Sequence, residues 1–131
     1  MNHVIKSIET DFAIISLLEN NVGHVHFKSN IEIDENIQLQ LLECYKSITN
    51  EPIPFIYSSD EFLSSTINAP EIARTIELQA PINMKVLVVQ NLAQRILAKF
   101  YYKKYQPVNP YTICSNIEDA LNWINHRRYI H

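Results

Sequence analysis

The sequence from Met84 to Ile124 decides the fold, because strand-type and helix-type patterns alternate along it. It opens with the nearly unbroken apolar run Met84–Val89 (MKVLVV), which is followed by the helix-type segment Leu92–Tyr105 (LAQRILAKFYYKKY). The β-type run Tyr111–Cys114 (YTIC) comes next, and the amphipathic segment Ile117–Ile124 (IEDALNWI) closes the unit. Strand, helix, strand and helix in this order predict a parallel crossover unit, around which the rest of the chain packs.

The first third of the chain predicts antiparallel strands and then a helix. Three apolar runs, Val4–Ile8, Phe12–Leu18 and Val22–Lys28, are separated by polar turn residues, and they predict a β-meander. Asp34 is a favourable N-cap, and it predicts a helix from Glu35 to about Ile48.

The middle of the chain is less regular. Ile53–Tyr57 predicts a short strand, and the capping-box pattern Ser58–Glu61 predicts a short helix through Phe62 and Leu63. Pro70 is well suited to the first turn of a further helix. The apolar set of the later helix-type segment, Leu92–Tyr105, consists of Leu92, Ala93, Ile96, Leu97, Phe100 and Tyr101.

Length and composition indicate one α/β domain over residues 1–131, with four to five helices and a mixed sheet of about six strands. The single glycine, Gly23, excludes the glycine-rich phosphate loops of nucleotide-binding proteins, because those loops need several glycines. No secretory signal or membrane-spanning run is apparent, so we expect a cytoplasmic protein. Cys44 and Cys114 are expected to be reduced thiols.

Charge is unevenly distributed along the chain, whose formal net charge is −3. Residues 1–65 carry three lysines against ten acidic residues, and residues 66–131 carry eight basic residues against four acidic ones. Solvated element faces account for this asymmetry, although surfaces of opposite sign also favour self-association or a charged partner. The acidic balance and the absence of a basic-aromatic binding motif argue against nucleic acid.

The chain resembles the STAS-like group, which has the fold of the anti-sigma-factor antagonists. The resemblance is carried by the meander, by the alternating strands and helices that follow it, and by the C-terminal tail, Pro107–Ile113 and Glu118–Ile124. The tail is similar to that of small uncharacterised bacterial STAS-like proteins. The better-known antagonists carry a phosphorylated serine in an Asp-Ser-Ser-Gly-type motif at a helix start. The corresponding stretch here, Tyr57–Asp60, has its aspartate after the serines and lacks the glycine.

Four sets of residues are candidates for a functional role. Ser58 and Ser59 are candidates for a phosphorylation switch at a predicted helix start, against which a plain helix cap is the simpler interpretation. His24 and His26 project from one strand face, as two metal ligands or as solvated histidines. The third set is a cationic ridge of Arg95, Lys99 and Lys103, which would bind an acidic partner or form a solvated face. The fourth set is the tyrosines beside it, Tyr102 and Tyr105, which would either contact a partner or seal the edge of the core.

No nucleophile with a neighbouring base can be assembled from the sequence, so we assign no catalytic, cofactor-binding or metal-binding residue. The STAS-like resemblance implies a non-enzymatic regulatory domain that binds a protein partner or a second copy of itself as a homodimer. The alternative is a small apolar or lipid-like ligand, as in the structurally related CRAL-TRIO-type domains. Its groove would lie beside the middle helices, at Phe62, Leu63, Ile72 and Ile76.

Overall fold

The computed structural model describes residues 3–60, 64–65 and 69–128. Six strands form one mixed sheet in the order β1-β2-β3-β5-β7-β8, and two two-residue strands pair separately as β4-β6. In chain order the elements are β1 (Val4–Glu9), β2 (Ala13–Leu18), β3 (Gly23–Phe27), β4 (Glu32–Ile33), α1 (Glu35–Ile48), β5 (Ile53–Ser59), β6 (Ser64–Ser65), α2 (Ala69–Glu77), β7 (Ile82–Val88), α3 (Leu92–Tyr105), β8 (Tyr111–Cys114) and α4 (Ile117–Arg128).

The pairing of the strands confirms the predicted architecture. Strands β1, β2 and β3 pair in antiparallel fashion as a meander, and β7 pairs with β8 in parallel, with α3 as the crossover between them. The meander joins the parallel half of the sheet through β3 and β5, which are also parallel. The helix predicted through Phe62 and Leu63 lies outside the described residues, and the short β4-β6 pair was not predicted.

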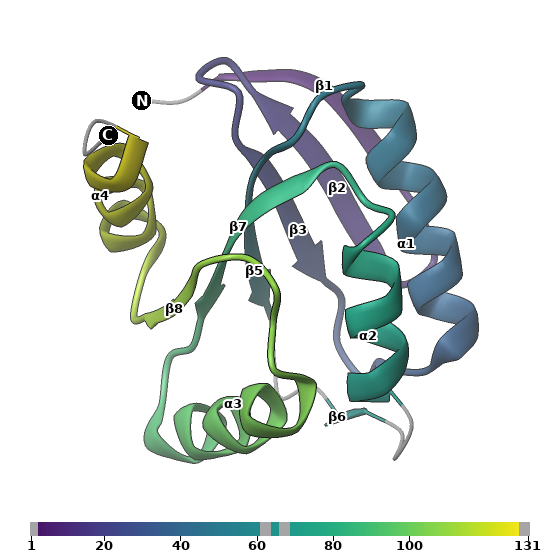
Figure 1. The fold of residues 1–131 in the computed structure, drawn as a ribbon, viewed down its shortest axis with the longest axis vertical. Helices are drawn as coiled ribbons and strands as arrows, with labels where there is room; N and C mark the ends of the chain where they lie inside the picture. The colour runs from purple at the N-terminus through teal and green to yellow at the C-terminus, as the bar shows by residue number, and fades with distance from the viewer. Residues whose placement is uncertain (1–2, 61–63, 66–68, 129–131) are drawn as a thin grey trace.

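The two faces of the sheet are covered differently (Figure 1). Helices α1 and α2 lie along one face, where the largest buried cluster includes Ile15, Val25, Phe55 and Tyr45. Helix α4 lies on the opposite face and packs its Ile124 in a smaller buried cluster with strands β5 and β7.

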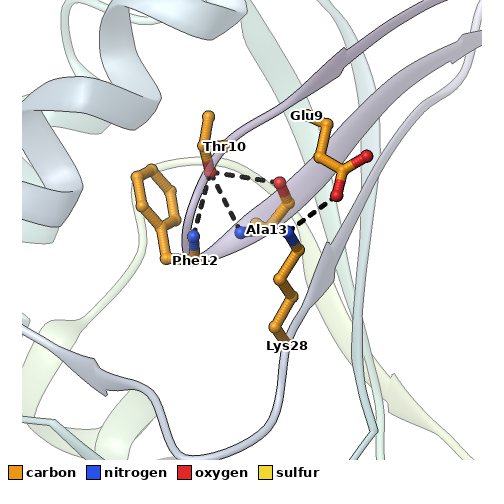
Figure 2. Close-up of polar contacts among 5 residues, drawn as sticks. All are labelled: Glu9, Thr10, Phe12, Ala13 and Lys28. Atoms are coloured by element: carbon orange, nitrogen blue, oxygen red, sulfur yellow. Dashed lines mark hydrogen bonds and ion pairs between the residues drawn. The ribbon is translucent and has the colours of Figure 1, made fainter.

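The turn between β1 and β2 is fixed by one side chain (Figure 2). The Thr10 hydroxyl donates to the carbonyl of Ala13 at 3.1 Å and accepts from the backbone N–H groups of Phe12 and Ala13. Beside this turn, Lys28 forms an ion pair with Glu9, with 2.8 Å between Nζ and Oε2. Both interactions hold the end of the meander at which the polar cluster described below is located.

Helix α3 packs with a face that the sequence pattern did not indicate. Its buried side chains are Ala98, Tyr102 and Tyr105, and the two tyrosines pack in a cluster with Ala73 of α2. Most of its apolar set instead faces outward, with exposed fractions of 71% for Leu92, 48% for Ile96, 45% for Leu97 and 67% for Phe100. The pattern failed because the large tyrosines, rather than the aliphatic residues, seal this part of the core.

Candidate functional site

Three features could carry a function: a hydrogen-bonded cluster around Ser58, a buried network around Lys85, and the outer surface of α3. The first unites two candidates that the sequence analysis treated separately. Parallel pairing of β3 with β5 aligns His24 with Ile56 and His26 with Ser58, so all of these side chains lie on one face of the sheet.

The Ser58 cluster is a continuous chain of short hydrogen bonds. The Ser58 Oγ lies 2.7 Å from Nε2 of His24 and 2.7 Å from Nδ1 of His26, while Nε2 of His26 lies 2.6 Å from Oδ1 of Asp60. The aspartate only accepts, so Nε2 of His26 carries a proton. With His26 neutral, its Nδ1 accepts from the Ser58 hydroxyl, whose oxygen in turn accepts from Nε2–H of His24.

The members of the cluster differ in solvent access. Ser58 is 9% exposed, whereas the side chains of His26 and Asp60 are 31% and 57% exposed. Burial, assisted by the charge of neighbouring His26, lowers the pKa of His24 from 6.5 to about 4. His24 is therefore a neutral donor at neutral pH.

Lys28, which directly follows β3, forms an ion pair and is not part of the Ser58 cluster. Lys28 binds Glu9, and its hydrogen bond and charge lower the pKa of that carboxylate (Figure 2). Among the described residues, no group of three or more His, Cys, Asp and Glu side chains could hold a metal ion. The cluster itself consists of one hydroxyl, two imidazoles and one carboxylate joined by hydrogen bonds.

The second feature is a buried network centred on Tyr105. Its hydroxyl accepts from Nζ of Lys85 at 2.8 Å and donates to Oε1 of Glu77 at 2.8 Å. The Glu77 carboxylate also accepts from the backbone N–H groups of Val108 and Asn109 and from the Asn109 amide. The network thus fastens the proline-containing loop between α3 and β8 to the end of α2.

Electrostatics at this network are strongly perturbed. Burial lowers the pKa of Lys85 from 10.5 to about 8, although the charge of Glu77 opposes the shift. Nζ of Lys85 also lies 5.1 Å and 4.6 Å from the ring centroids of Tyr57 and Tyr105. Burial disfavours the ionised form of Glu77, but the hydrogen bonds from Asn109 and Val108 outweigh it and lower the pKa of this carboxylate.

A small cavity of about 30 Å³ lies beside the network, where Gln38, Tyr45, Ile76 and Lys85 line it. This volume holds about one or two water molecules. Ile76 is the residue that links the cavity to the predicted apolar groove, whose Phe62 and Leu63 lie outside the described residues. Binding of a small apolar ligand in that groove stays a prediction.

The third feature is the outer surface of α3, which we call the α3 surface. It consists of Leu92, Ile96, Leu97 and Phe100 together with Arg95, Lys99 and Lys103. Leu92, Ile96 and Phe100 recur every fourth residue and form one ridge, and the three cationic residues form the adjacent ridge. Helix α3 contains four basic residues and no acidic one, so the whole surface is positive.

The structure corrects two of the predicted partner-binding residues. Tyr102 and Tyr105 are 5% and 1% exposed, so they belong to the core and not to a contact surface. Lys99 and Lys103 are exposed as predicted, while Arg95 is half-buried and donates to the Ser115 hydroxyl.

The predicted switch serines both lie within strand β5, before the residues that would form the predicted helix. The hydroxyl of Ser58 is bound by two histidines, which the sequence analysis did not pair with it. Cys44 and Cys114 are free thiols, as expected. Nothing in the described residues tests phosphorylation, which stays a prediction.

Comparison with known proteins gives a family for the chain. Residues 16–128 match the family described as Domain of unknown function (DUF7793). The chain belongs to the DUF7793 family. A search of curated proteins finds no significant match to this DUF7793 chain.

The structure of the DUF7793 chain is similar to the crystal structure of an uncharacterized protein from the DUF3478 family, with a SpoIIAA-like fold, from Shewanella loihica PV-4. The two share 10% sequence identity over 95% of each chain, with a TM-score of 0.48. Within the described residues, no helix of this DUF7793 chain is long and apolar enough to cross a lipid bilayer.

Proposed function

We propose that this DUF7793 domain is a regulatory binding module whose α3 surface receives an acidic amphipathic segment of a partner protein. The observation that carries the proposal is the outward-facing apolar ridge of Leu92, Ile96 and Phe100. Exposed apolar residues that are contiguous and bordered by charge are typical of protein contact sites, whereas single ones are ordinary.

The charge of the α3 surface supports a partner of acidic character. Arg95, Lys99 and Lys103 flank the apolar ridge, and no acidic residue of α3 neutralises them. A partner segment with its own apolar stripe beside carboxylates would cover the ridge and pair with these cations, which favours fast association and a fixed orientation. A second copy of this chain is the competing occupant, because residues 1–65 are acidic in total.

The test begins with a photocrosslinking amino acid at position 100 of the full chain in its host cell. Position 39 serves as the control, because Leu39 is 49% exposed on α1 and lies outside the α3 surface. We expect a discrete protein adduct from position 100 and not from position 39. The crosslinked protein is then purified, and its affinity for the chain is measured by titration calorimetry.

Phe100→Asp should weaken that affinity at least about thirtyfold, the effect of removing a central apolar anchor, while Leu39→Asp leaves it unchanged. Lys99→Glu should weaken it less, and the loss should shrink as salt is raised. Adducts only between copies of the chain would replace the proposal with self-association. The proposal would be rejected if position 100 gave no adduct or adducts with lipid only. Equal effects of Phe100→Asp and Leu39→Asp on the affinity would also reject the proposal.

A further inference from the structure

The cluster around Ser58 has a geometry that binding through α3 does not require. A serine hydroxyl, an imidazole and a carboxylate follow one another at hydrogen-bond distance: Ser58 Oγ to His26 Nδ1 at 2.7 Å, and His26 Nε2 to Asp60 Oδ1 at 2.6 Å. This sequence of groups is the arrangement in which a base activates a nucleophile while a third group orients the base.

The direction of each proton in the cluster favours this use. Asp60 holds the proton of His26 on Nε2, so Nδ1 is free to accept the hydroxyl proton of Ser58. In the serine-protease arrangement the carboxylate binds Nδ1 and the serine binds Nε2, so the two nitrogens exchange roles here. The chemistry is the same, because either imidazole nitrogen can accept the proton when the other carries a bound one.

We propose that Ser58 is a nucleophile that accepts an acyl group from an activated carboxylic ester, with His26 as its base and Asp60 as the positioning residue for His26. In the first step the Ser58 proton passes to His26 Nδ1, Oγ bonds to the ester carbonyl carbon, and the alcohol leaves with the proton from His26. Water, deprotonated by the same nitrogen, then releases the acid and restores the serine.

The surroundings of the cluster select an uncharged acyl donor over a phosphoryl donor. Asp60 is the charged partner within the cluster, and Lys28, further along β3, is paired with Glu9. The Asp60 carboxylate would repel an incoming phosphate, while a neutral ester meets no such repulsion. Ile14 lies opposite His26 on the same sheet face and is 36% exposed, which provides apolar surface for a short acyl chain.

His24 has a separate part in the site. Its Nε2 lies 2.7 Å from Ser58 Oγ, and as a neutral donor it keeps the serine hydrogen directed towards His26. When Oγ becomes bonded to the ester carbon, the former carbonyl oxygen carries the negative charge, and we expect the N–H of His24 to be the donor that reaches it. His24 is therefore a positioning residue in the resting site and a candidate donor to the tetrahedral intermediate.

The experiment uses the full chain with 4-nitrophenyl acetate as the probe. Release of 4-nitrophenolate is followed by absorbance, and the modified residue is located by peptide mass spectrometry. We expect one acetyl group on Ser58, with release at least about a hundredfold slower in Ser58→Ala and in His26→Gln, the size of a general-base contribution. Ser59→Ala is the matched control, since it is the adjacent serine of the same strand and points to the opposite face.

Asp60→Asn separates a positioning role from a structural one. The Asp60 side chain is 57% exposed, so we expect Asp60→Asn to fold with an unchanged melting temperature. This variant therefore tests the cluster even if Ser58→Ala does not fold. It should acetylate several-fold more slowly and shift the pH at which acetylation is half-maximal. The proposal would be overturned if no acetyl group formed, or if it formed on His24, His26 or a lysine instead of Ser58. Equal rates in the wild type and His26→Gln would overturn it as well.

Discussion

Tyr105 joins Lys85 to the rest of the buried network, because its hydroxyl oxygen lies 2.8 Å from Nζ of the lysine. The same hydroxyl donates its own hydrogen to Glu77, so one oxygen links a buried cation to a buried anion. Neither ion is in direct contact with the other within salt-bridge distance, since the described ion pairs are those of Lys28 and His26. The tyrosine therefore decides how well both charges are compensated.

Tyr105→Phe should lower the free energy of unfolding by about 2 kcal/mol, since it removes hydrogen bonds to two charged groups and leaves both buried. Urea denaturation followed by circular dichroism measures the loss. Tyr111→Phe is the matched control, because Tyr111 is 43% exposed on the edge strand β8. An equal, small effect of both substitutions would show that the bridge contributes nothing to stability.

The contribution of Lys85 to the free energy of unfolding should rise as pH is raised from about 7.5 to 9.5. Burial lowers the pKa of Lys85 to about 8 in the folded chain, while the unfolded lysine titrates near 10.5. In this window the unfolded chain binds more protons than the folded one, so raising the pH favours the folded state, by about 2 kcal/mol over the window.

Lys85→Met isolates this effect, because it keeps the side-chain length and removes the titrating amine. The difference in unfolding free energy between the two proteins, measured by urea denaturation at each pH, should move in favour of the wild type as pH rises. The free thiols and tyrosines titrate in both proteins and cancel in the difference. A difference that stays constant with pH would mean that the lysine titrates normally in the folded chain.

Local signals in the sequence were sufficient for much of the fold. The helices Glu35–Ile48 and Leu92–Tyr105 have the predicted bounds, and Asp34 caps the first by accepting from the N–H of Ile37 at 2.9 Å. Capping and strand alternation depend on neighbours a few residues apart, so one sequence contains them in full. The parallel pairing of β7 with β8 followed from the intervening helix in the same way.

The Ser58 cluster depends on pairing between segments 32 and 34 residues apart, and local patterns do not determine such a register. The strand containing His24 and His26 could have paired with any later strand of the sheet. The exposed ridge of α3 escaped prediction for a different reason. A tyrosine suits both a contact surface and the edge of a core, and Tyr105 is buried because its hydroxyl finds the buried partners Lys85 and Glu77.

Gly23→Ala should destabilise the chain by roughly 1–3 kcal/mol, because a methyl group at this position would overlap the ring of Phe55. Phe55 is fully buried on the neighbouring strand β5, so the ring has little room to move. Phe55→Leu should relieve the overlap, and the double variant should be more stable than the sum of the two single losses predicts. Strictly additive losses in urea denaturation would show that the glycine is needed for another reason.

Acidification from pH 7 to 4 should destabilise the chain through His24. In the folded state burial and the charge of His26 lower the pKa of His24 to about 4, while the unfolded histidine titrates near 6.5. Between these values the unfolded chain binds more protons, so stability falls as pH falls, by up to about 3 kcal/mol for this group alone.

His24→Gln is the informative variant for this prediction, because the amide can still donate to Ser58 and cannot be protonated in this range. The stability of wild type relative to His24→Gln, from urea denaturation at each pH, should decrease steadily between pH 6.5 and 4. Asp and Glu side chains titrate in both proteins, so the comparison removes their contribution. Parallel curves would mean that His24 accepts a proton in the folded chain as readily as in water, and that the short contact with Ser58 does not depend on its neutral form.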